Sequence, residues 1–119
     1  MPKILVVDDD LSLLEIYKEI FAKAGFAVET AEDAVSAVTK YQIFKPDLLV
    51  LDVEMPAGGG RKVFDCLRTV YQTATPIIFS TGMPEKVQGP AKMANVSVLK
   101  KPVTPETLIA EVKKLLKIP

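Results

Sequence analysis

Short apolar segments that end in charged residues recur along this chain, and they restrict its fold more than any other feature. Three segments carry the pattern: Ile4-Leu5-Val6-Val7 before Asp8-Asp9-Asp10, Leu48-Leu49-Val50-Leu51 before Asp52, and Val96-Ser97-Val98-Leu99 before Lys100-Lys101. Segments of this length are typical of buried strands. The first two lack polar alternation, which favours strands covered on both faces. If these strands are parallel and end at one edge of a sheet, two groups of carboxylates and a group of lysines would lie together at that edge.

Helical patterns separate these segments, so strands and helices alternate. We expect strands at residues 3–7, 26–30, 47–52, 76–80 and 96–99, and helices at 12–24, 33–44, 61–71 and 104–116. Gly25 marks the end of the first helix, and Thr104 and Pro105 mark the start of the last. The alternation predicts an α/β fold with a doubly wound parallel five-stranded sheet, in a single domain over residues 1–119.

Two stretches rich in glycine or proline interrupt the alternation. Gly58-Gly59-Gly60 predicts a flexible bend before the helix at 61–71. Pro84, Gly89 and Pro90 follow the fourth strand, and a Gly-Pro pair inside a helix removes a backbone donor and clashes with the preceding turn. We therefore expect the fourth helix, near residues 84–95, to be short, broken or mobile, or replaced by a stable loop.

The composition excludes several functions. Fifteen basic and fifteen acidic residues give a formal net charge of zero, so we expect no direct nucleic-acid binding and no membrane binding by this domain. We also expect no signal peptide and no membrane span. Cys66 is the only cysteine, so with no internal disulfide a cytoplasmic location is expected. Histidine is absent, so any histidine chemistry must come from a partner.

The residues at the predicted strand ends fit phosphoryl chemistry. Asp8, Asp9 and Asp52 are carboxylates without histidine beside them, which favours a hard divalent cation such as Mg²⁺. A carboxylate beside such an ion stays ionised and can attack phosphorus, giving an aspartyl phosphate. Lys101 can supply a cation to the phosphoryl oxygens, and Thr81, one residue beyond the fourth strand, a hydroxyl.

Each signal has an ordinary structural explanation when it is taken singly. The triplet Asp8-Asp9-Asp10 can cap the first helix, Thr81 can be a strand-end threonine, and Lys100-Lys101 can be a solvated pair. Their joint position at the ends of four strands favours the functional interpretation.

The same residues resemble the receiver domain of bacterial two-component response regulators. The similarity rests on Asp8-Asp9, Asp52, Met55-Pro56, Ser80-Thr81-Gly82 and Lys101-Pro102, and it spans residues 3–117. It implies a flavodoxin-like (βα)5 fold with strand order 2-1-3-4-5. It also implies that Asp52 takes a phosphoryl group from a partner phosphohistidine in a Mg²⁺-dependent reaction. The domain would then switch conformation for protein–protein output.

The resemblance assigns roles to single residues. Lys101 would pair with Asp52 and then with the phosphoryl oxygens, while the Thr81 hydroxyl would swing toward the phosphate. The Lys101–Pro102 bond would be cis. Asp8 would act on the metal largely through water. The implied metal ligands are Asp8, Asp9, Asp52 and the Glu54 backbone carbonyl.

The resemblance also implies partners. The phosphodonor would be a sensor histidine kinase or a histidine phosphotransfer protein. The receiver of the signal would be a downstream protein target, an output domain outside this sequence, or a second copy in a phosphorylation-dependent homodimer. The domain would not be an enzyme beyond self-phosphorylation and slow autodephosphorylation. On the first helix, Ile16 is the candidate contact for the donor. The helix residues expected in the core are Leu14, Tyr17, Phe21 and Ala24.

Three positions set this chain apart within that pattern. Val98 occupies the position, three residues before Lys101, where the family usually has an aromatic ring that changes rotamer. Valine has only χ1, so either backbone shifts transmit the change or the output surface differs. The positions that Glu54 and Met83 occupy flank the phosphoryl group in the family and tune the lifetime of the phosphorylated state. Methionine cannot hold an attacking water by a strong hydrogen bond, so we expect slow hydrolysis.

Two other functions fit parts of the pattern. A haloacid-dehalogenase-like phosphatase also forms an aspartyl phosphate and has a second acid at the spacing of Glu54, although it normally has aspartate there and a cap for which this chain is too short. Turnover of a small phosphate ester would favour it. A phosphorylation-independent interaction module is the other alternative. A degenerate receiver usually loses one member of the acid, threonine and lysine set, and here the set is complete.

Overall fold

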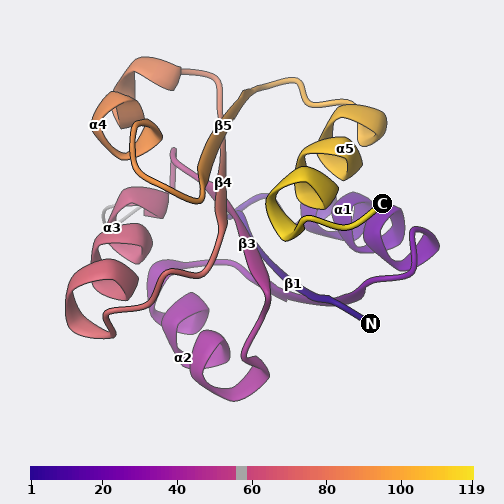
Figure 1. Cartoon of the computed structure of the whole chain (residues 1–119), viewed down its shortest axis with the longest axis horizontal. Coiled ribbons are helices and arrows are strands. Elements are labelled where there is room, and N and C mark those ends of the chain that lie inside the picture. The colour runs from indigo at the N-terminus through magenta and orange to yellow at the C-terminus, as the bar shows by residue number, and fades with distance from the viewer. Residues whose placement is uncertain (56–58) are drawn as a thin grey trace.

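Five strands form one parallel sheet in the computed structural model, which describes residues 1–55 and 59–119. The strands are β1 (Lys3–Val7), β2 (Ala27–Ala31), β3 (Leu48–Asp52), β4 (Ile77–Thr81) and β5 (Val96–Lys100). Their order in the sheet is β2-β1-β3-β4-β5 (Figure 1). The predicted doubly wound α/β fold and its strand order are therefore confirmed.

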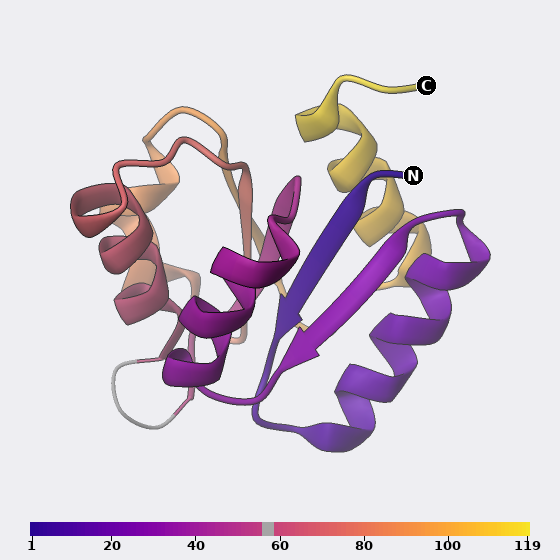
Figure 2. The same cartoon turned by 90° about the horizontal axis from the view of Figure 1, so that it is seen from below.

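Helices cover both faces of this sheet (Figure 2). On one face lie α1 (Leu11–Lys23) and α5 (Pro105–Leu116), and on the other lie α2 (Ala34–Phe44), α3 (Gly59–Asp65) and α4 (Gln88–Ala91). A π-helical stretch, Cys66–Val70, continues α3, and a 3₁₀ turn, Pro84–Val87, precedes α4. Among the described residues, no helix combines the length and apolar character that crossing a membrane requires.

The central strands are the most deeply buried elements. All of β3 and β4 is buried, and so is β1 after Lys3, whereas β2 and β5 are only partly buried at the two edges. The uninterrupted apolar runs read from the sequence are thus strands covered on both faces. Because these strands are packed on both sides, the residues that follow them have well-defined positions.

Separate apolar clusters fill the two faces of the sheet. Under α1 and α5, Phe21 packs edge-to-face on Phe26 with ring centroids 5.9 Å apart, and Leu14 and Tyr17 are buried as predicted. Under α2 and α3, the core includes two further aromatic rings, Phe64 and Phe79. The core prediction was wrong for Ala24, which is exposed because it is the C-cap where the chain leaves α1.

Local signals set the helix ends. Asp10 caps α1 by accepting a hydrogen bond from the Leu13 backbone N–H at 3.2 Å, so the capping explanation of the acidic triplet holds for this member. Thr104 caps α5 as predicted. Gly25 has φ +91°, a left-handed conformation that glycine adopts without steric cost, and it follows the α1 cap as predicted. The predicted cis bond between Lys101 and Pro102 is also present.

The two irregular stretches turned out differently. The short fourth helix is confirmed, since α4 has a single turn that contains Gly89 and Pro90. Gly59 and Gly60 begin α3, so the predicted bend is wrong for Gly60. At Gly59 the chain does turn, since this residue has φ +59°, while Gly58 lies outside the described residues. A Cβ at Gly60 would lie 2.5 Å from the Asp52 carbonyl oxygen, so glycine is needed here for close approach to β3.

Candidate functional site

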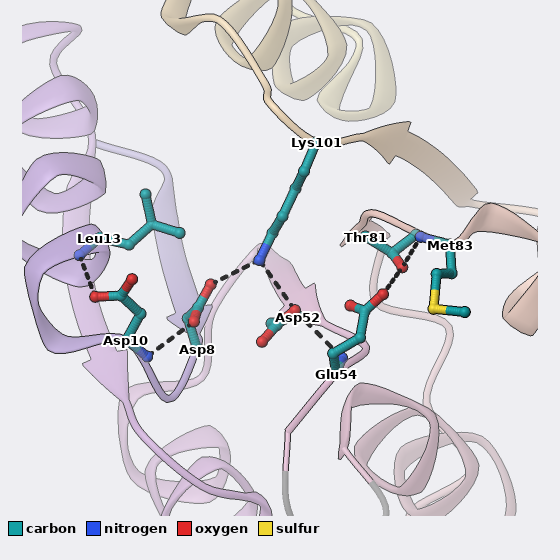
Figure 3. A network of polar contacts seen from close by, with 8 residues as sticks. All are labelled: Asp8, Asp10, Leu13, Asp52, Glu54, Thr81, Met83 and Lys101. Atoms are coloured by element: carbon teal, nitrogen blue, oxygen red, sulfur yellow. Dashed lines mark hydrogen bonds and ion pairs between the residues drawn. The ribbon is translucent and has the colours of Figure 1, made fainter.

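Two buried carboxylates lie side by side at the C-terminal edge of the sheet. Val7 pairs with Leu51 in adjacent strands, and the next residue in each strand direction is Asp8 on one side and Asp52 on the other. Both side chains point into the space below Lys101 in Figure 3. Asp8 is 2% exposed and Asp52 3%. Burial disfavours the charged form of both carboxyls, so a nearby cation stabilises them as a pair of carboxylates.

Lys101 supplies that cation from the segment after β5. Its Nζ lies 3.1 Å from Asp52 Oδ1 and 3.3 Å from Asp8 Oδ2. Its backbone N–H donates to the Thr81 carbonyl at 2.8 Å, which fixes the start of the side chain against β4. Burial by itself would lower the pKa of Lys101, but the hydrogen bonds and charges of Asp52 and Asp8 outweigh it and raise that pKa. The ammonium therefore stays protonated.

Desolvation dominates the titration of Asp52. Burial, together with the nearby charge of Asp8, raises the pKa of Asp52 to about 6, against the opposing effect of the Lys101 hydrogen bond. Because this carboxylate is poorly solvated, a further cation beside it would strongly stabilise its charged form.

The carboxylates fit a hard metal ion. One oxygen from each of Asp8, Asp9 and Asp52 lies within 4.8 Å of the other two, and Asp9 is exposed at the mouth of the group. Three carboxyl groups lie near a single lysine ammonium, so carboxyl groups outnumber cations among the described residues of this group. An all-oxygen donor set with an open side suits Mg²⁺, which retains several waters. The Glu54 carbonyl stays a predicted ligand.

Thr81 is bonded to Glu54 and not to Asp52. The Thr81 side chain is fully buried at the end of β4. Its hydroxyl donates to the Glu54 carboxylate and accepts the Met83 backbone N–H at 2.9 Å. Burial alone would raise the pKa of Glu54, but hydrogen bonds, chiefly that from Thr81, lower it. No sequence pattern signals this contact, because it joins the chain after β3 to the end of β4.

Sequence reasoning also assigned no role to Ser80. This residue pairs in register with Asp52 across β3 and β4 and is 2% exposed. Its hydroxyl has no hydrogen-bond partner among the described residues. Because a period of two places registered partners on the same sheet face, a polar residue beside Asp52 was the available signal.

Val98 lies away from the acidic group, on the α4 side of β5. Its half-buried side chain lines a groove of about 580 Å³ with the 3₁₀ turn and α4. The other residues lining this groove are Pro84, Glu85, Gln88, Ala91 and Lys92. Ile16, the predicted donor contact, is 52% exposed on α1.

A parallel sheet of this order, with carboxylates and a lysine at its C-terminal edge, defines a flavodoxin-like domain with a ligand site outside its strand ends. The family described as response regulator receiver domain matches residues 4–113. The chain therefore belongs to the receiver domain family of two-component signalling, and its role is that of a phosphoacceptor signalling domain. Receiver domains are signalling domains and not classical enzymes.

Full-length relatives show the same family. The probable transcriptional regulator ycf27 of Cyanophora paradoxa is 36% identical over 118 residues, covering 97% of this chain and 48% of the relative. The alkaline phosphatase synthesis transcriptional regulatory protein PhoP of Bacillus subtilis is also 36% identical, with the same two coverages. The chain thus spans about half the length of these curated relatives.

Among solved structures, the chemotaxis protein CheY4 of Vibrio cholerae superposes with a TM-score of 0.87 at 34% identity, covering 97% of this chain and 98% of that protein. A receiver domain from Clostridium thermocellum reaches a TM-score of 0.90 at 22% identity, which shows the shared fold alone.

Proposed function

We propose that Asp52 is the phosphoacceptor of this receiver domain. Its carboxylate oxygen attacks the phosphorus of a phosphohistidine, an O–P bond forms, the N–P bond breaks, and the partner imidazole leaves with the electron pair and takes up a proton. The observation that carries this proposal is the Lys101 ammonium 3.1 Å from Asp52 Oδ1, with Asp8 on its other side. A cation already in place needs no reorganisation when phosphoryl charge arrives.

The surrounding residues have complementary roles. Asp8, Asp9, Asp52 and the Glu54 carbonyl would hold Mg²⁺, which when bound offsets the negative charge of the phosphoryl oxygens. The Lys101 ammonium donates a hydrogen bond to Asp52 before the reaction. It therefore lies close enough to bind an oxygen of the phosphoryl group that Asp52 receives. The Thr81 hydroxyl donates a hydrogen bond to a second phosphoryl oxygen once its bond to the Glu54 carboxylate has broken. We expect self-phosphorylation from small phosphodonors and slow autodephosphorylation.

The phosphodonor must carry the histidine that this sequence lacks. We propose a cytoplasmic domain over residues 1–119 that meets a sensor histidine kinase or a histidine phosphotransfer protein. Output passes to a protein target, to an attached output domain, or to a second copy, without direct nucleic-acid contact by this domain. Exposed Ile16 on α1 contacts the donor. Ile16→Lys should slow transfer from a phosphohistidine protein while leaving phosphorylation by acetyl phosphate unchanged.

The experiment that tests the phosphoacceptor is intact-protein mass spectrometry after incubation with Mg²⁺ and acetyl phosphate. Wild type is expected to gain one phosphoryl group and Asp52→Asn none, because an amide is not a nucleophile toward phosphorus. An adduct on Asp52→Asn would place the phosphoryl group elsewhere. No adduct together with no Mg²⁺ binding would leave a phosphorylation-independent interaction module. Turnover of a small phosphate ester would instead favour a phosphatase.

A further inference from the structure

Glu54 contacts both the proposed phosphoacceptor and the hydroxyl that is to bind its phosphoryl group. The Glu54 backbone N–H donates to Asp52 Oδ1 at 3.3 Å, and its carboxylate accepts the proton of the Thr81 hydroxyl. Figure 3 shows the Glu54 side chain lying between Asp52 and the chain at Met83. Glu54 therefore connects the ends of β3 and β4 in the unphosphorylated protein.

The Thr81 hydroxyl is fully engaged in this arrangement. A hydroxyl has a single proton to donate, and Thr81 gives it to Glu54. The oxygen also accepts the Met83 N–H at 2.9 Å. The Thr81 side chain is fully buried, and both partners of its hydroxyl are groups of the protein. A phosphoryl oxygen that is to receive this proton must compete with the Glu54 carboxylate for it.

We propose that Glu54 holds Thr81 in the unphosphorylated arrangement, and that their hydrogen bond must break before Thr81 bonds the phosphoryl group. This inference rests on the proposed phosphorylation of Asp52. Glu54 is then a positioning residue that acts through Thr81. Glu54 stabilises the arrangement in which Thr81 bonds its carboxylate. At a given degree of phosphorylation, fewer molecules therefore reach the arrangement in which Thr81 bonds the phosphoryl group.

The same contact ties the switch to the chain that follows β4. Breaking the bond moves the hydroxyl that holds the Met83 N–H, and the 3₁₀ turn Pro84–Val87 begins at the next residue. Pro84 and Val98 line one groove, so a shift of this turn changes the groove. Val98 occupies the position in this groove where the family usually has an aromatic ring. The signal at Thr81 can thus reach that surface through backbone alone.

A matched set of variants tests the inference with beryllofluoride, which mimics the phosphoryl group, in the presence of Mg²⁺. Calorimetry gives its affinity for wild type, Glu54→Ala, Thr81→Val and the double variant. Glu54→Ala is expected to tighten binding about tenfold when Thr81 is present, because a charge-assisted hydrogen bond no longer opposes the change. In the Thr81→Val background the same substitution should change affinity less than twofold.

The cycle separates an action through Thr81 from simple charge repulsion. Equal tightening in both backgrounds would mean that the Glu54 charge acts directly on the beryllofluoride, and the inference would be wrong. Unchanged affinity in Glu54→Ala would also overturn it. If wild type, like Asp52→Asn, binds no beryllofluoride, the proposed function itself fails, and the inference with it.

Thermal unfolding without beryllofluoride gives a second readout. Glu54→Ala should lower the melting temperature, because the unphosphorylated protein loses a hydrogen bond, while its affinity for beryllofluoride rises. Damage to the site would lower both. Glu85→Ala is the control for charge, since Glu85 is an exposed carboxylate on the turn Pro84–Val87, and it should leave both quantities unchanged. A lower affinity in Glu54→Ala would contradict the inference.

Discussion

The acidic edge of the sheet and the region around α4 follow the receiver pattern to different degrees. At the acidic edge, Asp8 and Asp52 follow or end strands that are buried on both faces, and Lys101 lies between them. Around α4, a single helical turn contains Gly89 and Pro90, and Val98 stands where the family usually has an aromatic ring. One region keeps the family's residues, and the other does not.

The two regions are under different physical constraints. A carboxylate 3.1 Å from an ammonium tolerates little displacement, so the strands that hold it must be closely packed. A surface that contacts another protein has to match that partner only, and partners differ. We therefore expect substitutions at the acidic edge to affect chemistry and stability together. Substitutions around α4 should alter stability slightly and leave the acidic group intact.

Lys101→Ala should give the largest effect on stability. It leaves Asp8 and Asp52 buried beside each other without a cation, and removing one partner of a buried ion pair is strongly destabilising. Because the Lys101 side chain is 29% exposed, we expect a loss of about 2–3 kcal/mol of unfolding free energy at pH 8 without divalent ions. Urea denaturation measures it, and the loss should shrink at pH 5, because burial raises the pKa of Asp52 to about 6 and this carboxyl then takes up a proton.

The neighbouring lysine provides the control for this substitution. Lys100 ends β5 with an exposed side chain, so Lys100→Ala should stay within about 0.5 kcal/mol of wild type. Equal losses for the two lysines would mean that the ion pairs at the acidic edge contribute nothing to the fold.

Asp52→Asn should have a smaller, pH-dependent effect of opposite sign. The pKa of Asp52 is about 6 in the folded protein, against 3.8 ordinarily. Between these values the unfolded chain loses the proton that the folded protein keeps, so wild type loses stability as pH rises from 4 to 6. Above pH 6 the amide variant should be more stable by about 1 kcal/mol, after allowing for solvent screening.

Calorimetric melting at pH 4 and pH 7, without divalent ions, measures this difference. We expect coincident melting temperatures at pH 4 and a variant higher by about 4 °C at pH 7. Saturating Mg²⁺ should stabilise wild type more than the variant, because a carboxylate ligand is lost. A constant difference across pH would exclude desolvation of Asp52 as its cause.

The acidic edge could be predicted from the sequence because strand ends and residue types determine it together. Continuous apolar runs located β1 and β3, and parallel strands bring the residues after them to one edge. Asp8, Asp52 and Lys101 therefore converge without further information. The short α4 was predictable for a similar reason, since Gly89 and Pro90 oppose a longer helix through their own backbone chemistry.

Contacts between side chains of different segments were not predictable in this way. The bond between Glu54 and Thr81 depends on how the chain after β3 approaches the end of β4, and neither residue has a local signature for it. The start of α3 was predicted at Arg61 instead of Gly59 for a related reason. The glycines indicate a bend locally, and Gly59 does have φ +59°, yet Gly60 already belongs to the helix, where only glycine allows the close approach to β3. In both cases tertiary packing decides what the local sequence leaves open.

Gly89→Ala should give the smallest effect and shows how much α4 can change. Gly89 lies inside the single turn of α4, and apart from its own helix backbone and chain neighbours, a Cβ there would meet no atom of residues 1–55 and 59–119 within 4 Å. Alanine reduces the freedom of the unfolded chain and favours helix, but its Cβ would crowd the Cδ of Pro90 in helical backbone. Because these effects oppose each other, we expect a change within about 0.5 kcal/mol in unfolding free energy by urea denaturation. Mg²⁺ affinity should stay the same.

Gly25→Ala is the matched comparison, since a Cβ there would also meet no atom of the described residues within 4 Å beyond its chain neighbours, but its φ is +91°. Here alanine is forced into the left-handed region, and we expect a loss of about 1 kcal/mol. The two substitutions add the same methyl group, so a loss at Gly25 alone would isolate the left-handed backbone conformation as its cause. An equal loss at both would mean that crowding against Pro90 outweighs the helix preference of alanine at Gly89.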